Sequence, residues 1–289
     1  MSTAPRSTRA LASLALTGVA LSACARPPAR VPLCPPSPLG DTAEALADPS
    51  AWAHLLVPDF NPRRDPLATP RACTGEAIDA PPPRSDAPLR PLPREPPSAL
   101  DLSVIALDDH LLVWLRLDHF PDGDALGPAA LVARSGALEV TAIGPLRAPA
   151  TGASLRHARL ADGTALLIAE GDRCPAAAPC VREAHLLAID GPRLRDLPLR
   201  LPGRAAATAR IALVEDDERR GALGWTERRH LERRLVADDR GLALIATEER
   251  ITCPKGHSEG CQAQLRRAHR CELVHHESAL VCTDPAGDR

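Results

Sequence analysis

The chain contains no tyrosine, only two phenylalanines and only three tryptophans in 289 residues. Few aromatic rings are therefore available to stack on bases or sugars. The 35 basic residues are balanced by 37 acidic ones, so no basic excess exists for a phosphate backbone. Lys255 is the only lysine, and the abundant arginine matches GC-rich codon usage rather than a choice for phosphate recognition. These shortages argue against nucleic acid as a partner.

Sequence motifs for common cofactors are missing as well. The chain has no phosphate-binding glycine loop, no dinucleotide fingerprint and no HExxH zinc helix. It also lacks any Cys-x-x-Cys pair and the Cys-x-x-Cys-His string that binds haem covalently. We therefore expect no cofactor and no bound metal.

The first 23 residues are organised like a secretory signal peptide. Arg6 and Arg9 form a basic start, and the uncharged apolar run that follows, residues 10–20, is too short to span a bilayer. Next comes Leu21-Ser22-Ala23-Cys24, an aliphatic residue, two small residues and a cysteine. This string resembles the lipobox of bacterial prolipoproteins. The resemblance implies cleavage before Cys24 and a diacylglyceryl group on its sulfur.

A lipid-modified Cys24 would anchor the mature protein to a membrane. Several acyl chains hold a protein at a bilayer more firmly than a single chain does. Ala25 is not the aspartate that retains lipoproteins at the inner membrane in the best-known sorting system, so we expect the outer membrane of the cell envelope. The alternative is a secreted protein in which Cys24 lies by chance near an Ala-x-Ala-like cleavage site.

Eight cysteines remain when Cys24 is set aside, an even number in a chain directed to an oxidising compartment. Disulfides are therefore expected. Eight cysteines allow 105 connectivities, and proximity along the chain is the only guide to pairing. It favours Cys34–Cys73, Cys174–Cys180, Cys253–Cys261 and Cys271–Cys282.

A metal site is the alternative use of the C-terminal cysteines. Thiolate and imidazole groups are soft ligands that suit zinc and similar ions. The residues that could contribute are Cys253, His257, Cys261, His269, Cys271, His275, His276 and Cys282.

Residues 24–98 are rich in proline and hold 19 of the 31 prolines in the chain. Proline fixes φ and removes a backbone donor, so such a stretch cannot supply regular ladders. We interpret it as an extended tether with polyproline II character. A short helix is possible over residues 42–57, and Cys34 and Cys73 flank it and could staple it.

From residue 99 to residue 289 the pattern is typical of strands and hairpins in a disulfide-stabilised ectodomain. Residues 111–118 alternate between apolar and polar faces toward their end, as a half-buried strand does. Turn signals separate the apolar runs, and an antiparallel meander is the simplest topology that joins them. The signals are Ser135-Gly136, Asp162-Gly163, Asp190-Gly191 and Asp239-Arg240-Gly241.

A faint repeat suggests two versions of this mainly β fold. Residues 111–147 resemble residues 165–200, and residues 222–250 form a third copy. A spacing of about 50 residues is similar to that of kelch-like propeller blades, and about four blades would close. The other version is an irregular sandwich or barrel of hairpins. Alternating strands and long amphipathic helices are absent, which disfavours a doubly wound α/β fold.

One string resembles a catalytic motif. Gly256-His257-Ser258-Glu259-Gly260 fits the G-x-S-x-G pattern of the nucleophile elbow in α/β-hydrolases. The elbow needs a strand that ends directly at the turn, whereas Pro254 and Lys255 intervene here, and Cys253 and Cys261 bracket the motif. We interpret it as a disulfide-closed loop, with a hydrolase using Ser258 as the alternative.

Two acidic segments could offer oxygen ligands to calcium, residues 118–124 and residues 215–218. Residues 118–124 lack the Asp-x-Asp-x-Asp-Gly spacing and the terminal glutamate of an EF-hand. We expect solvated loops at both places.

These observations favour a membrane-anchored lipoprotein that acts as a non-catalytic binding or scaffolding module of the cell envelope. Its expected partners are the membrane, through the lipid anchor, and an unidentified envelope protein. An envelope serine hydrolase using Ser258 and a metal-dependent accessory protein are the alternatives.

Overall fold

The computed structural model describes residues 32–35, 40–63, 68–79, 90–134, 137–175, 179–202, 206–220, 225–253 and 261–283, without the side chains of residues 264 and 265. The predicted signal peptide, Cys24, the turn at Ser135-Gly136 and Ser258 lie outside these ranges. One compact unit is assigned to Pro32–Arg289. No helix within the described ranges has the length and apolar character needed to cross a membrane.

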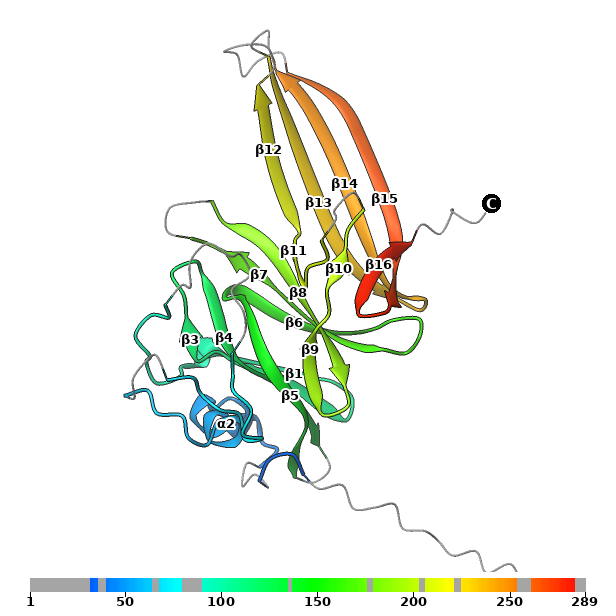
Figure 1. The fold of residues 1–289 in the computed structure, drawn as a ribbon. Helices are drawn as coiled ribbons and strands as arrows, with labels where there is room; N and C mark the ends of the chain where they lie inside the picture. The colour runs from blue at the N-terminus through cyan, green and yellow to red at the C-terminus, as the bar shows by residue number, and fades with distance from the viewer. Residues whose placement is uncertain are drawn as a thin grey trace, which may run out of the picture. The chain divides into compact units, whose positions relative to one another are not determined.

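The mainly β prediction is confirmed (Figure 1). Three short helical segments precede the strands: α1 (Ala43–Leu46), α2 (Pro49–Leu56) and the 3-10 turn η1 (Ala99–Asp101). The strands are β1 (Leu102–Ala106), β2 (His110–Leu115), β3 (Asp118–His119), β4 (Asp124–Arg134), β5 (Leu138–Pro149), β6 (Thr151–Arg159), β7 (Ala165–Arg173), β8 (Val181–Asp190), β9 (Arg193–Asp196), β10 (Leu199–Arg200), β11 (Arg210–Ala212), β12 (Val214–Arg220), β13 (Thr226–Asp238), β14 (Gly241–Cys253), β15 (Gln262–His276) and β16 (Ala279–Thr283).

The first sheet is a nearly closed, barrel-like structure. Its main path of eight strands runs β1-β2-β4-β5-β9-β8-β7-β6, with β3 added on β4 and β11 added on β8. The end strands β1 and β6 approach each other without forming a ladder. Most neighbours are antiparallel, and β5 and β9 are parallel.

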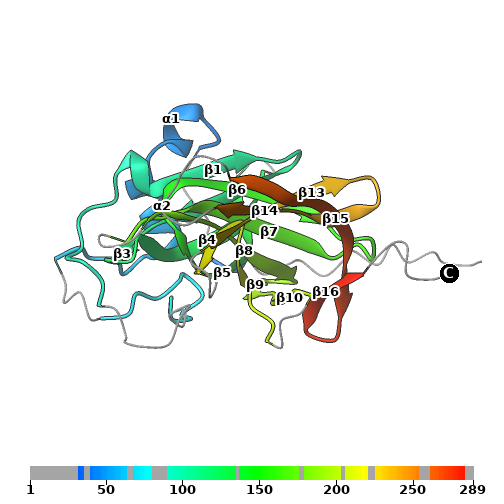
Figure 2. The same ribbon diagram turned by 90° about the horizontal axis from the view of Figure 1, so that it is seen from above.

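The second sheet is a curled half-barrel of six strands in the order β10-β16-β15-β14-β13-β12. Its strands β12 to β15 are joined by antiparallel steps, whereas β10 and β16 are parallel. Figure 1 shows the long strands β12–β15 extending away from the first sheet, on the side opposite α2, and Figure 2 views the fold along them.

The predicted hairpins form, but they do not gather into blades. Gly163 and Gly191 take positive φ angles of 88° and 55° in the β6–β7 and β8–β9 turns, which a side-chain-bearing residue rarely adopts. The first two copies of the predicted repeat share one continuous sheet because β5 pairs with β9, and the third copy forms β13 and β14 of the other sheet. The fold is thus the barrel version of the prediction.

Three apolar clusters hold the fold together. Trp114, Leu146 and Leu167 belong to a cluster drawn from the inward faces of the barrel strands. The opposite face of β6–β8, including Ile168, packs against the base of the second sheet in another cluster that includes Leu244. The two sheets therefore share one core.

The third cluster joins the proline-rich segment to the barrel. Trp52 and Leu56 of α2 are fully buried against residues of β2 and β4. Asp48 caps the N-terminus of α2, because its side chain accepts a hydrogen bond from the N–H of Ser50 at 2.9 Å. Pro49 is the first residue of the helix, a position that suits proline. A disulfide joins Cys34 to Cys73 across this segment.

The expected tether therefore differs from the observed structure in its described part. The sequence placed the start of the folded region near residue 99, whereas the compact unit begins at Pro32. Proline prevents a segment from forming ladders, but α2 is anchored by apolar side chains and a disulfide, neither of which needs a ladder.

Candidate functional site

The described cysteines all form disulfides. The four pairs are the ones that proximity favoured: Cys34–Cys73, Cys174–Cys180, Cys253–Cys261 and Cys271–Cys282. Disulfides persist in oxidising compartments and are rare in the cytosol. The protein is therefore extracytoplasmic.

The C-terminal cysteines and histidines come together only in part. His269, Cys271 and Cys282 place their potential ligand atoms within 4.8 Å of one another. Cys271 and Cys282 are bonded to each other, whereas a cysteine binds a metal only as a free thiolate. In the oxidised protein this cluster is therefore a disulfide beside a histidine. His257 lies outside the described residues.

The acidic segment 118–124, expected as a solvated loop, instead supplies buried ion pairs. Asp118, in β3, accepts hydrogen bonds from both Nε and Nη2 of Arg94, the one from Nη2 at 2.9 Å. Both side chains are more than nine-tenths buried. This bidentate pair fixes the extended segment around Arg94 to the barrel. The carboxylate oxygens are therefore occupied by arginine rather than available to calcium.

A larger group of charges lies at one rim of the barrel, where β4 begins and β5 ends. Asp124 has no exposed side-chain surface and accepts from Arg147 Nε at 3.1 Å and from Arg210 Nη1 at 2.9 Å. Glu183 accepts from Arg173 Nε at 3.1 Å and from Arg210 Nη1 at 3.4 Å. We call this group the rim network; its members are Asp122, Asp124, Arg147, Arg173, Glu183 and Arg210.

The rim network is a charge-balanced, hydrogen-bonded cluster with a structural role. It contains three arginines and three carboxylates, so its formal charges cancel. Arg147 also stacks over the Phe120 ring at 3.9 Å, and Arg210 Nη2 donates to the backbone oxygen of Arg147 at 2.7 Å. Buried charges are tolerated when they are paired and hydrogen-bonded in this way.

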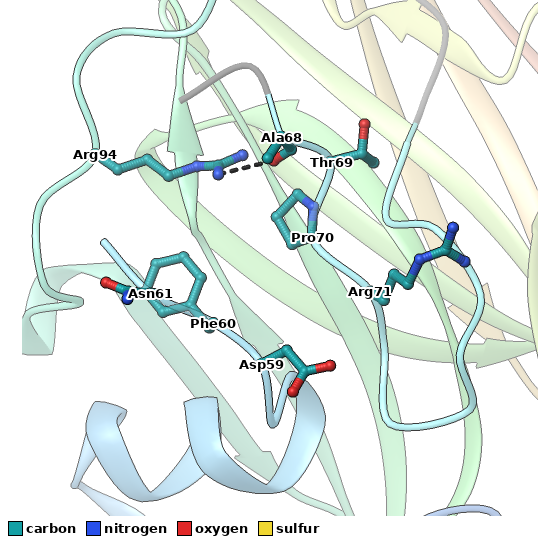
Figure 3. A pocket seen from close by; sticks show the side chains of 8 residues that line it. All are labelled: Asp59, Phe60, Asn61, Ala68, Thr69, Pro70, Arg71 and Arg94. Atoms are coloured by element: carbon teal, nitrogen blue, oxygen red, sulfur yellow. Dashed lines mark hydrogen bonds between the residues drawn. The ribbon is translucent and has the colours of Figure 1, made fainter. Parts of the chain in front are cut away.

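A small pocket is enclosed by residues 59–61, which follow α2, by residues 68–71 and by Arg94. Its volume is about 220 Å³. Figure 3 shows Arg94 reaching toward Ala68, whose carbonyl oxygen accepts from Arg94 Nη1 at 2.9 Å. Asp59 and Arg71 bring charges of opposite sign to the same pocket. The remaining lining residues are Phe60, Asn61, Thr69 and Pro70, so the pocket offers polar binding groups but no serine, cysteine or histidine among its described residues.

The second acidic segment, residues 215–218, was expected at a loop tip and instead forms the middle of β12. Successive residues of a strand point to opposite faces of the sheet, so these four carboxylates do not converge on one ion. Asp216 accepts from His230 Nδ1 at 2.8 Å, and Glu215 accepts from Arg233 Nη1 at 2.8 Å.

A further polar surface is the sheet made by β12, β13, β14 and residues 262–271 of β15, which we call the projecting sheet. Its apolar residues, such as Leu235, Leu244 and Cys271, are buried near the base, where the strands cover the barrel. Between this base and the tip, the strands carry many charged side chains on both faces. Strands of 13 to 15 residues thus extend well beyond the part needed to cover the core.

Ion pairs cross the projecting sheet from strand to strand. Glu248 accepts from Arg229 Nε at 2.7 Å and from Arg250 Nε at 2.9 Å. The hydrogen bond from Arg250, with that from Arg229, holds the pKa of Glu248 below its ordinary value. These exposed pairs each contribute little to stability, but they give the surface a fixed pattern of charge.

Sequence reasoning missed the rim network and the projecting sheet. The partners in the rim network lie far apart in the chain: Arg210 is 86 residues from Asp124. A local pattern cannot reveal such a pair. The projecting sheet did leave a signal, because the strands that form it are rich in charge on both faces where a half-buried strand would alternate.

Comparison of the chain with known protein families, with curated proteins and with solved structures finds no match.

Proposed function

We propose that the protein is a lipid-anchored, non-catalytic binding or scaffolding module of the cell envelope, held at the outer membrane through Cys24. The projecting sheet is its binding surface. One observation carries this proposal: β13, β14 and β15 continue beyond the shared core as a sheet that is charged on both faces. A sheet normally buries at least one face against an apolar layer.

The extracytoplasmic location supports the proposal. The four disulfides fit a protein that is exported by a signal peptide. The lipobox resemblance at residues 21–24 supplies the anchor. An anchored module with an extended polar surface is suited to presenting that surface to another envelope protein.

Mass spectrometry of protein extracted from native membranes tests the anchor. We expect a mature chain that begins at Cys24 and carries diacylglyceryl on its sulfur. A mature N-terminus elsewhere, or an unmodified Cys24, would contradict the proposal.

Site-specific photocrosslinking tests the binding surface. A photoreactive residue in place of His230, which is 46 % exposed on the projecting sheet, should give a discrete adduct in native membranes. The matched control replaces Asp190, which is 68 % exposed on the first sheet. Equal adducts at both positions, or none at His230, would count against the projecting sheet as the binding surface.

A further inference from the structure

The projecting sheet has two open edges of opposite charge. β12 forms a ladder only with β13, so its outer edge has no ladder partner in the described part of the chain, although the start of the strand lies against β8. Residues 262–271 of β15 pair only with β14, because β16 begins to pair at Glu272. The β12 edge carries the four acidic residues 215–218, followed by Arg219 and Arg220. The β15 edge carries Arg266, Arg267, His269 and Arg270.

The register places acids and bases in the same rows of the sheet. Glu215 of β12 lies opposite Leu231 of β13, which lies opposite Glu248 of β14. Glu248 in turn lies opposite Arg267 of β15. Cross-strand partners share a face of the sheet, so the side chains of Glu215 and Arg267 belong to the same face and the same row.

The neighbouring row repeats this arrangement on the other face. Asp216 lies opposite His230, which lies opposite Glu249. Glu249 lies opposite Arg266. Neither Arg266 nor Arg267 makes an ion pair or hydrogen bond to another residue that the structure describes. Two basic side chains on one edge thus align with two acidic side chains on the other.

The strand directions also suit contact between the two edges. Each step from β12 to β13, β14 and β15 is antiparallel, so β15 runs opposite to β12. When a second copy lies beside the first with its rows aligned, β15 of one copy meets β12 of the other in antiparallel orientation. This is the pairing used throughout the projecting sheet.

We propose that the partner of the projecting sheet is a second copy of this chain, whose acidic β12 edge pairs with the basic β15 edge of the first. The inference rests on the proposed role of the projecting sheet as a binding surface. Glu215 then faces Arg267 of the other copy on one face, and Asp216 faces Arg266 on the other face.

Charge disfavours contact between two β15 edges. That contact would set arginine against arginine, and like charges directly opposite each other are destabilising. Charged side chains on an edge commonly prevent unwanted pairing. Charges of the same sign on both edges would prevent pairing. Charges of opposite sign in matching rows instead favour contact between a β12 edge and a β15 edge. The contact is therefore heterologous.

Engineered disulfides in native membranes test the pairing with the full chain. Two tagged copies are expressed together, with Asp216→Cys in one and Arg266→Cys in the other, and Glu215→Cys with Arg267→Cys as a second combination. Adjacent rows of an antiparallel ladder alternate between wide and narrow pairs, so one combination brings the Cβ atoms close enough for a disulfide. We expect a mixed-tag dimer on non-reducing gels.

The matched controls place the same cysteine in both copies. We expect Asp216→Cys with itself and Arg266→Cys with itself to give about tenfold less dimer than the better unlike combination. Raising the ionic strength from about 0.05 M to about 0.5 M before oxidation should lower the yield for the unlike edges, because it screens the exposed charges.

Two results would overturn the pairing: equal yields from like and unlike edges, or no dimer from any combination. If neither unlike combination gives a dimer while Cys24 carries lipid and His230 still gives an adduct, self-pairing is excluded and the proposed function stands. If Cys24 is unmodified, the proposed function fails whatever the gels show.

Discussion

The carboxylate of Asp124 is fully buried and holds two arginines of the rim network. Replacing it with asparagine leaves buried guanidinium groups without their counter-charge. We expect Asp124→Asn to lower the free energy of unfolding by about 3–5 kcal/mol, measured by urea denaturation. The control is Asp190→Asn, because Asp190 pairs with Arg195 at 3.6 Å on an exposed surface, and its loss should cost less than about 1 kcal/mol. Similar losses for the two variants would refute a structural role for the rim network.

Asp101 forms a capping box with Ser98 before β1. Burial alone would raise the pKa of Asp101, but hydrogen bonds from the Ser98 backbone and side chain, together with His119, lower it below its ordinary value. A carboxylate whose pKa is lowered by folding stabilises the protein at pH values above its pKa in the unfolded chain, which is about 3.9 for aspartate. This contribution is lost as the pH falls through the lower pKa of the folded state.

We therefore expect Asp101→Asn to cost about 1 kcal/mol at neutral pH. The stabilities of variant and wild type should converge below about pH 4. Urea denaturation at several pH values measures the difference, with the exposed Asp239→Asn as control. A difference that does not depend on pH would show that the charge of Asp101 has no part in capping.

Individual residues were the hardest scale to predict from sequence. The composition shows that arginine is abundant, but it could not say which arginines are buried. Arg94 and Arg147 find their carboxylates only when β3, β4 and β5 come together. Such pairs depend on long-range packing, and nothing in the neighbouring residues encodes them.

Among the elements, α2 tests where the folded region begins. Trp52 is fully buried, so Trp52→Ala should lower the free energy of unfolding by about 3–5 kcal/mol. The control is His54→Ala on the exposed side of the same helix, where we expect a change within about 0.5 kcal/mol. Thermal or urea unfolding measures both. A negligible effect of Trp52→Ala would restore the tether interpretation for this segment.

Strands and hairpins were the most predictable elements. The glycine turns located the β6–β7 and β8–β9 hairpins from local sequence alone. The half-buried strand predicted over residues 111–118 corresponds to β2, which ends at Leu115 and is buried from Leu111 onward. The acidic run of β12 predicts a loop because charge normally marks a solvated turn. It forms a strand because it pairs with β13. The part of the sheet that contains β12 is not covered by an apolar layer, so its charged side chains remain largely exposed.

At the scale of the whole molecule, the two sheets share a core, and we expect them to unfold together. Leu244 of β14 lies in the same cluster as Ile168 of β7. Leu244→Ala should cost about 2–5 kcal/mol. Hydrogen exchange should then speed up by a similar factor for the most protected amides of both sheets. Faster exchange confined to the second sheet would show that the sheets unfold as separate units.

The arrangement of the two sheets could not be predicted. Repeated hairpins suggested blades, but hairpins resemble one another in any antiparallel fold. The deciding contact is the short parallel pairing of β5 with β9, which joins two predicted repeats into one barrel-like sheet. A single pairing between residues 50 positions apart leaves no periodic trace: Ile143 lies opposite Arg193.

The disulfide pattern also has a consequence for biogenesis. Apart from Cys24, every cysteine is joined to its immediate neighbour in the order of the cysteines along the chain. A chain exported from its N-terminus delivers its thiols in that order, so an oxidase that joins each new thiol to the last unpaired one makes the native set directly. We expect cells that lack a disulfide isomerase to accumulate the correctly paired protein at an undiminished level, as peptide mapping without reduction would reveal; scrambled pairs in such cells would contradict this. Correct disulfide formation would then depend on the order in which the cysteines are translocated rather than on later rearrangement by an isomerase.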